Sequence, residues 1–172
     1  MRRPSRILLF ATVTVVLSIL GTDPAAGREI WSGRHFYFAK ADSADWSLPA
    51  NQDPITPAVR ITRKHDHGIF NIAQESEYVT NVSPVDTEWA TGDAASWESL
   101  AFQPWQVWAQ NYPPGTIGAN ACVHLISEDI YVDIRFDSWT ESAHGGGFAY
   151  IRATGPTPAE DTEWGVVKAL FK

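Results

Sequence analysis

Two histidines that flank a single aspartate, His65 and His67, are the residues whose type and spacing most suggest chemistry. Side chains two positions apart on a β-strand point to the same face, so both imidazoles can reach one metal ion. A third ligand would come from a carboxylate or from one of the other histidines, His35, His124 and His144, none of which stands at a diagnostic spacing. The run also fits a polar turn between apolar segments, and the turn is the favoured interpretation over a metal site at His65 and His67.

One local pair of carboxylates, Glu75 and Glu77, has a spacing that suits acid–base catalysis. In an extended segment their side chains share a face and lie about 6.6 Å apart. A glycosidase holds its two carboxyl groups about 5 to 9.5 Å apart, but no neighbour marks either glutamate as an acid with a raised pKa. No serine stands in a nucleophile-elbow sequence either. The sequence therefore assigns no catalytic residue.

Eight tryptophans are a high number for 172 residues, and core filling is the expected role for most of them. Trp46, Trp105 and Trp108 stand beside prolines or polar loop residues, so these three are expected to be exposed and to contact a sugar-type ligand or a partner. The long loop of residues 42–57, rich in Asp, Pro and Asn, is a candidate recognition loop. Its favoured alternative is a cap over one end of the fold, with Trp46 and Leu48 plugging the core.

The segments that must position these residues are short and rich in β-formers. In residues 129–137 every second residue, from Ile130 to Phe136, is apolar, which predicts a strand with one buried face. Asp129, Asp133 and Asp137 fall on the opposite face, and neighbouring aspartates among them lie roughly 13 Å apart along the strand. This distance is too long for a shared cation, and the face is predicted to be a solvated charged surface.

Nine β-rich runs separated by turn residues predict an all-β fold, a single antiparallel β-sandwich of jelly-roll-like arrangement. These runs are residues 34–39, 58–63, 69–73, 87–90, 99–102, 121–127, 129–139, 148–153 and 164–171. Three consecutive glycines, residues 145–147, lie between the runs 129–139 and 148–153. They supply the positive φ values that a hairpin end needs. An anion-binding nest would require a helix after these glycines, whereas a strand is predicted there.

The first 27 residues have the order of a secretory signal peptide: basic residues, an apolar run and a small-residue cleavage site. The apolar run is shorter than the about 20 residues that span a bilayer, so cleavage is favoured over an anchor. Residues 28–172 then form one β-sandwich domain, secreted or periplasmic, with no membrane span after cleavage. A monomer or a module of a larger protein is expected.

The chain is acidic, with 13 basic and 20 acidic residues and a formal net charge of −7. This charge disfavours binding to nucleic acid or to anionic membranes. A single cysteine, Cys122, excludes an intramolecular disulfide bond, and its apolar neighbours predict a small buried side chain rather than a reactive thiol. No cofactor is expected.

The pattern of residues 124–139 followed by Gly145 to Arg152 resembles a recurring segment of uncharacterised secreted bacterial proteins. Residues 46–53 and 86–89 are similar to the same group, so the resemblance spans most of the predicted mature chain. It implies an exported bacterial β-module, found alone or attached to other domains. It implies no activity and no site residues, because none is assigned to that group.

The leading functional prediction is an exported, non-catalytic binding or structural module that contacts a carbohydrate or a cell-surface partner. Its contact surface would combine Trp46, Trp105 and Trp108 with the loop of residues 42–57. The alternative is a small secreted hydrolase that uses a carboxylate pair or a histidine-bound metal ion.

Overall fold

The computed structural model describes residues 27–141 and 143–156. The predicted signal peptide, apart from Gly27, and the predicted strand of residues 164–171 lie outside these described residues. Among the described residues, no helix is long and apolar enough to cross a membrane.

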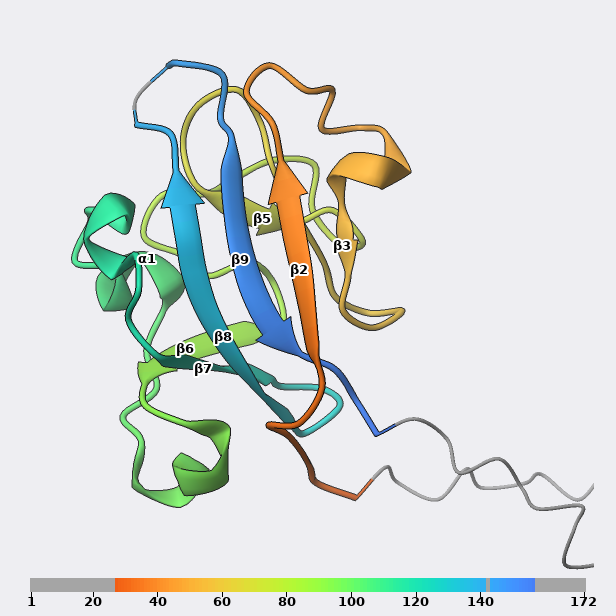
Figure 1. The fold of residues 1–172 in the computed structure, drawn as a ribbon, viewed down its shortest axis with the longest axis vertical. Helices are drawn as coiled ribbons and strands as arrows, with labels where there is room; N and C mark the ends of the chain where they lie inside the picture. Colours follow the sequence, from red (N-terminus) through yellow and green to blue (C-terminus); the bar gives the residue numbers. More distant parts are fainter. Residues whose placement is uncertain (1–26, 142, 157–172) are drawn as a thin grey trace, which may run out of the picture.

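The described chain is mostly β-strand, with a few short helical turns between the strands (Figure 1). The strands are β1 (Glu29–Trp31), β2 (His35–Lys40), β3 (Asp53–Pro54), β4 (Arg60–Arg63), β5 (Ile69–Asn71), β6 (Thr87–Thr91), β7 (Ala121–Leu125), β8 (Ile130–Trp139) and β9 (Phe148–Ala153). The helical turns are η1 (Pro49–Asn51), η2 (Ala94–Ser99), α1 (Trp105–Trp108) and η3 (Pro113–Thr116).

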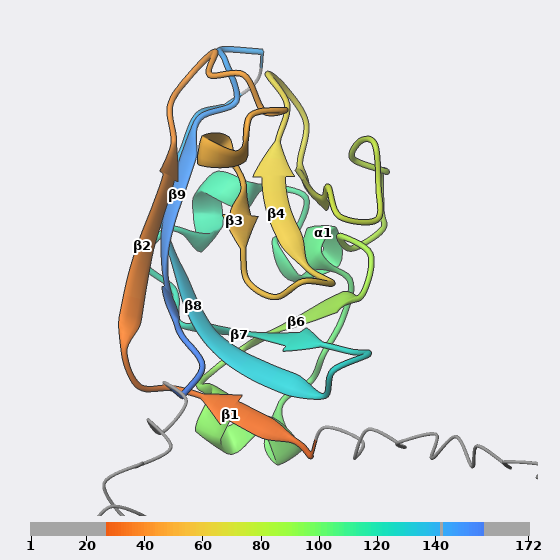
Figure 2. The same ribbon diagram turned by 90° about the vertical axis from the view of Figure 1, so that its right-hand side faces the viewer.

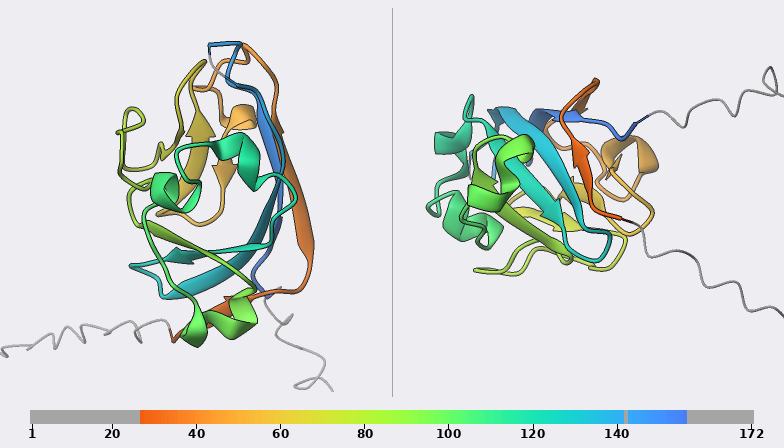
Figure 3. Two further views of the ribbon diagram at one scale, coloured as in Figure 1. Left: turned by 90° about the vertical axis from the view of Figure 1, so that its left-hand side faces the viewer. Right: turned by 90° about the horizontal axis from the view of Figure 1, so that it is seen from below.

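The larger sheet is organised around β8, the longest strand. Its order is β2-β9-β8-β7-β6, with every one of these pairs antiparallel, and β1 adds to β8 in parallel. On one edge β8 pairs with β7, and on the other edge it pairs first with β1 and then with β9. β1 and η2 meet at one end of the molecule, below β8 in Figure 2 and in the left-hand view of Figure 3.

A β-bulge between Phe136 and Ser138 changes which side chains of β8 face inward. Strict alternation would place Ser138 beside Phe136 on the inner face, but the extra residue in the bulge shifts the pattern by one. Trp139 consequently joins Phe136 on the inner face, and their ring centroids are 5.9 Å apart. The bulge therefore delivers a large aromatic ring to the end of the sheet.

The smaller sheet, β3-β4-β5, lies against the inner face of the larger one, and α1 covers the remaining part of that face (Figure 2). Side chains from both sheets and from α1 form one hydrophobic core, which includes Ile61, Ile69, Trp89, Trp105, Trp108, Val132, Phe136 and Tyr150. The predicted buried face of β8, from Ile130 to Phe136, is confirmed. Its opposite face is not uniformly solvated, because η2 covers Tyr131.

The prediction of an all-β fold with antiparallel pairing is confirmed. The parallel pairing of β1 was not predicted, and residues 99–102 are wrong as a strand, because η2 ends at Ser99 and a single bridge joins Trp89 to Gln103. The finer prediction of a jelly-roll-like sandwich stays a prediction.

Candidate functional site

An aromatic cavity of about 360 Å³ opens where several loops meet beside the end of β8. Four of its lining residues are tyrosines or tryptophans from distant parts of the chain: Tyr78, Trp105, Tyr112 and Trp139. Its polar lining residues include Arg63, His67, Thr80, Gln106, Asn111 and Glu141. A cavity that combines aromatic rings with a few polar groups is the usual form of a small-ligand site.

The rings of the aromatic cavity hold one another in place. Trp105 lies 5.5 Å from Trp139 between ring centroids, and the edge of Tyr78 meets Trp105 at 6.4 Å. His67 stacks on Tyr78, with 12° between the ring planes. The turn between β4 and β5 can approach these rings because residue 68 is glycine: a methyl group there would lie 2.6 Å from the Trp105 ring.

Of the two tyrosines and two tryptophans of this cavity, Tyr112 is the one open to solvent, with 55% of its surface exposed. Its hydroxyl donates to Glu141 Oε1 at 3.3 Å, which links the loop before η3 to the segment that follows β8. A ring with one free face beside a carboxylate can stack against an apolar ligand surface while the carboxylate accepts a hydrogen bond.

The inner wall of the aromatic cavity is fixed by a buried arginine. The Arg63 guanidinium lies 3.9 Å from the centre of the Trp139 ring and donates to the carbonyl oxygens of His67, Thr140 and Gly147. Burial lowers the pKa of Arg63 to about 10. Because Nε and Nη1 donate to backbone oxygens inside the protein, Arg63 acts as a support for the cavity wall.

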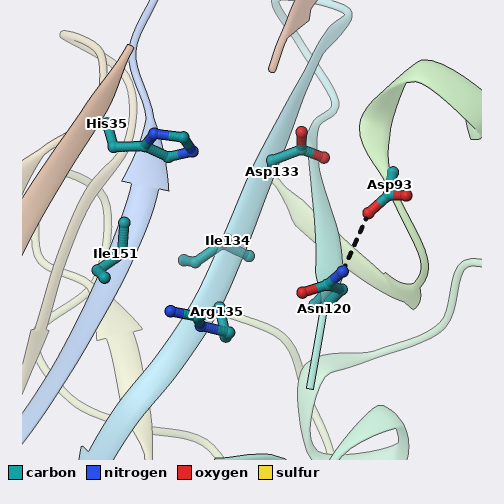
Figure 4. Close-up of a pocket in the computed structure, with 8 residues that line it drawn as sticks. His35, Asp93, Asn120, Asp133, Ile134, Arg135 and Ile151 are labelled. Atoms are coloured by element: carbon teal, nitrogen blue, oxygen red, sulfur yellow. Dashed lines mark hydrogen bonds between the residues drawn. The ribbon is translucent and has the colours of Figure 1, made fainter. Parts of the chain in front are cut away.

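A second cavity, of about 450 Å³, lies over the outer face of β2, β9, β8 and β7 and is called the outer-face cavity (Figure 4). It is lined by His35, Asp93, Asn120, Ala121, Asp133, Ile134, Arg135 and Ile151. The Asn120 amide donates to Asp93 at 3.4 Å, and the backbone N–H of Ala94 donates to Asp133. Burial is the main cause that raises the pKa of Asp133 above its usual value, and the charge of Asp93 raises it further.

The expectation that Trp105 and Trp108 are exposed is wrong, since 2% and 6% of their surfaces are accessible. The segment that carries them folds as α1 and packs against β6. The Trp108 ring stacks on Trp89, and its Nε1–H donates to Thr91. Both tryptophans therefore belong to the core, although one edge of Trp105 also lines the aromatic cavity.

Trp46 is half-buried and lies away from the aromatic cavity. Its ring packs against Phe70 of the smaller sheet, and Lys64 Nζ stands 4.8 Å from its centre. Leu48 is 52% exposed, so it does not plug the core as the cap interpretation expected. Of Trp46 and Leu48, only Trp46 thus packs the loop of residues 42–57 against the smaller sheet.

His65 and His67 lie in the turn between β4 and β5 rather than on a strand, and both are exposed. The two histidines therefore do not share a strand face, and His67 has a positive φ of 58°. Among residues 27–141 and 143–156, no three His, Cys, Asp or Glu side chains are grouped to hold a metal ion. Of the other histidines, His35 lines the outer-face cavity and His124 pairs with Glu88 at 2.7 Å.

The residues proposed for acid–base chemistry do not act as a pair. Glu75 accepts hydrogen bonds from the backbone N–H groups of Asn71 and Val85 and so closes a turn. Glu77 is exposed and pairs with Lys64 at 3.3 Å. The structure does not bring these glutamates together with His65 and His67 in one site. A hydrolase built on either pair stays a prediction.

Tyr78, Tyr112 and Trp139 were not predicted as members of a cavity. Their segments carry no local signal, because each ring reaches the cavity through long-range packing. Of the two features that build this cavity, only the glycine at position 68 is visible in the sequence, because the bulge that turns Trp139 inward is a property of strand pairing.

Comparison of the chain with protein-family models, with curated proteins and with solved structures finds no significant match. The fold and its cavities therefore define the class of protein only. The chain is an all-β protein with a cavity built by loops and another on an outer sheet face.

Proposed function

We propose that this protein is a non-catalytic binding module that acts outside the cytoplasm, and that the aromatic cavity receives a sugar unit of a glycan. The observation that carries this proposal is the meeting of four aromatic rings with a polar rim in one cavity of about 360 Å³. A pyranose has apolar C–H faces and a rim of hydroxyl groups, so it needs both kinds of contact.

The exposed ring of Tyr112 is the surface on which the sugar stacks in this proposal. Glu141 and Asn111 stand beside it and supply an acceptor and an amide to the hydroxyl groups. Trp105 and Trp139 form the wall behind, held by Arg63. Because these groups are already in contact with one another, little side-chain order has to be gained on binding.

The binding test uses two tyrosines with the same exposed fraction, 55%, in different places: Tyr112 in the aromatic cavity and Tyr37 on β2. The wild type is screened on a glycan array, and the best binder is measured by calorimetric titration. Replacement Tyr112→Ala is expected to weaken binding roughly tenfold, the size of one aromatic stacking contact. Replacement Tyr37→Ala is expected to leave the affinity unchanged.

Trp105→Ala is not a suitable variant, because truncating a buried tryptophan costs about 3 to 5 kcal/mol of stability. Glu141→Gln keeps the shape and removes the charge, so it tests the polar rim without disturbing the core. Equal affinities of Tyr112→Ala and Tyr37→Ala, or a wild type that binds no glycan on the array, would refute the proposal.

A further inference from the structure

We propose that the outer-face cavity is a second binding site, for a small zwitterion that carries an ammonium group and a carboxylate, as a free amino acid or a short peptide does. This proposal does not depend on the aromatic cavity. It rests on the way in which charged side chains are distributed over an apolar floor in a cavity of about 450 Å³.

The acidic side of the cavity is formed where η2 rises over the larger sheet. Asp93 precedes η2 and Asp133 lies on β8, and both line the cavity on the side of η2 (Figure 4). Their hydrogen-bond donors are neutral: the Asn120 amide for Asp93 and the Ala94 backbone N–H for Asp133. Two carboxylates that line one cavity attract a cation, and an ammonium group donates three hydrogen bonds.

The basic side lies toward β2 and β9, where His35 and Arg135 line the cavity (Figure 4). The Arg135 guanidinium is exposed and makes no ion pair or hydrogen bond with any other described residue. A free guanidinium binds a carboxylate through two parallel hydrogen bonds. Arg135 therefore supplies the anion-binding half of the site.

The distance between the two halves suits a small molecule. Asp133 and Arg135 stand two residues apart on the same face of β8, which separates their Cα atoms by roughly 6.6 Å. Ile151 of β9 is opposite Arg135 in the register and forms an aliphatic floor beside it. A ligand with both charges at its ends and an aliphatic side chain satisfies all three surfaces.

Ligands of one charge fit less well. A phosphate or a dicarboxylate would place negative charge beside Asp93 and Asp133, and a polyamine would place positive charge beside Arg135. The separation of the two signs within one cavity thus selects against both classes. A zwitterion has no net charge, so the negative net charge of the protein does not repel it.

The experiment titrates the full-length protein with leucine and with the dipeptide Ala-Leu, followed by calorimetry and by amide NMR shifts. The two ligands distinguish a free amino acid from a peptide as the source of the charges. The N-acetylated and the C-amidated dipeptides each lack one charge and are expected to bind roughly tenfold more weakly or worse. Shifted NMR signals should map to the outer-face cavity.

Matched variants locate the binding. Asp133→Asn keeps the oxygen that accepts from Ala94 and is expected to weaken Ala-Leu binding at least about tenfold. Arg135→Gln should do the same, whereas Asp137→Asn, exposed on the same strand and outside the cavity, should not. Circular dichroism checks that each variant folds.

Three results would overturn the proposal. One is the absence of binding by either ligand at millimolar concentration. The second is binding that survives acetylation and amidation of the dipeptide. The third is an equal affinity of the Asp133→Asn and Asp137→Asn proteins.

Discussion

Three buried polar side chains, Asp53, Tyr150 and Arg152, connect the two sheets at the level of single residues. Arg152 donates to both carboxylate oxygens of Asp53, at 2.6 and 2.7 Å, and the Tyr150 hydroxyl donates to the same carboxylate at 2.6 Å. Asp53 belongs to β3 and the other two belong to β9, and all three are buried. The cluster therefore fixes how the smaller sheet sits on the larger one.

Asp53→Asn should lower the free energy of unfolding by about 3 to 5 kcal/mol, because it leaves the Arg152 charge buried without its counter-charge. Tyr150→Phe removes one hydrogen bond to a charged group and should cost about 1.5 to 3 kcal/mol. Urea unfolding followed by circular dichroism measures both values. Glu77→Gln, which removes the charge of the exposed partner of Lys64, serves as the control and should have little effect. Equal losses for Asp53→Asn and Glu77→Gln would contradict the structural role of the cluster.

Asp133 leads to a pH-dependent prediction at the same scale. Burial raises its pKa in the folded protein, so the folded state binds a proton more readily than the unfolded state does. Stability from this group is therefore present below the unfolded pKa of about 3.9 and is lost as the pH rises through the folded pKa. Asp133→Asn should stabilise the protein at neutral pH, and the gain should vanish near about pH 4.

Urea midpoints of the wild type and of Asp133→Asn at several pH values measure this effect. Asp137→Asn reports any general effect of lowering the negative charge on β8. A stabilisation by Asp133→Asn that is the same at acidic and at neutral pH would show that the carboxyl group is not the cause.

At the scale of elements, the hairpin that precedes β9 depends on glycine. Gly146 has a φ of +67°, and an added methyl group would collide with the carbonyl oxygen of Lys64. The carbonyl oxygens of Gly145 and Gly146 accept from the buried Lys40 ammonium, at 3.5 and 3.2 Å, and Gly147 accepts from Arg63. The glycines thus present oxygen atoms to two buried cations, and the Gly147 N–H donates to the Asp42 carboxylate at 2.8 Å, so contacts within the protein fix this hairpin.

Gly146→Ala should destabilise the protein more than two other glycine replacements. Gly118→Ala has the strain of a positive φ, +79°, without any neighbour within 4 Å, and should cost about 1 to 2 kcal/mol. Gly33→Ala has neither problem and should be neutral or slightly stabilising. Thermal melting temperatures rank the three variants. A Gly146→Ala protein that melts with Gly118→Ala would show that the hairpin can move away from Lys64.

Local alternation explains why some elements could be predicted from the sequence. β9 has the predicted bounds, and β8 begins one residue later than predicted, because their side chains alternate between a core and an outer face. β1 has three residues and no readable period, and it is held by its parallel partner β8. Residues 99–102 contain β-formers, but their position after η2 is decided by packing on β7 and β8.

The candidate sites were harder to predict than the strands for a physical reason. Trp105 and His67 were singled out for different roles, exposure to a ligand and metal binding, yet both line the aromatic cavity. Their meeting depends on contacts between β4, α1 and the end of β8, which no local spacing encodes. The outer-face cavity has the same origin, since Asp93 reaches Asp133 through the path of η2.

At the scale of the whole molecule, the described chain has one main core that draws on both sheets and on α1. A smaller cluster under η2 contains Ala94, Cys122 and Tyr131, packed by Trp97 and neighbouring apolar side chains. Cys122 is fully buried there, and burial raises its pKa to about 12. The prediction of a small buried side chain at this position is confirmed. Because η2 also contacts β1, β7 and β8, its opening should accompany the loss of the larger sheet.

Cys122 therefore provides a test of cooperativity across the whole fold. A thiol that is buried and protonated should not react with a disulfide reagent near neutral pH until the cluster under η2 opens. If the sheets and η2 unfold as one unit, the labelled fraction of Cys122, measured after a short pulse at each urea concentration, should follow the circular dichroism transition. Tryptophan fluorescence, dominated by the main core, should give the same midpoint. Labelling that is complete at a lower urea concentration than the loss of β-structure would show instead that η2 opens on its own, since that opening exposes the thiol while the main core stays folded.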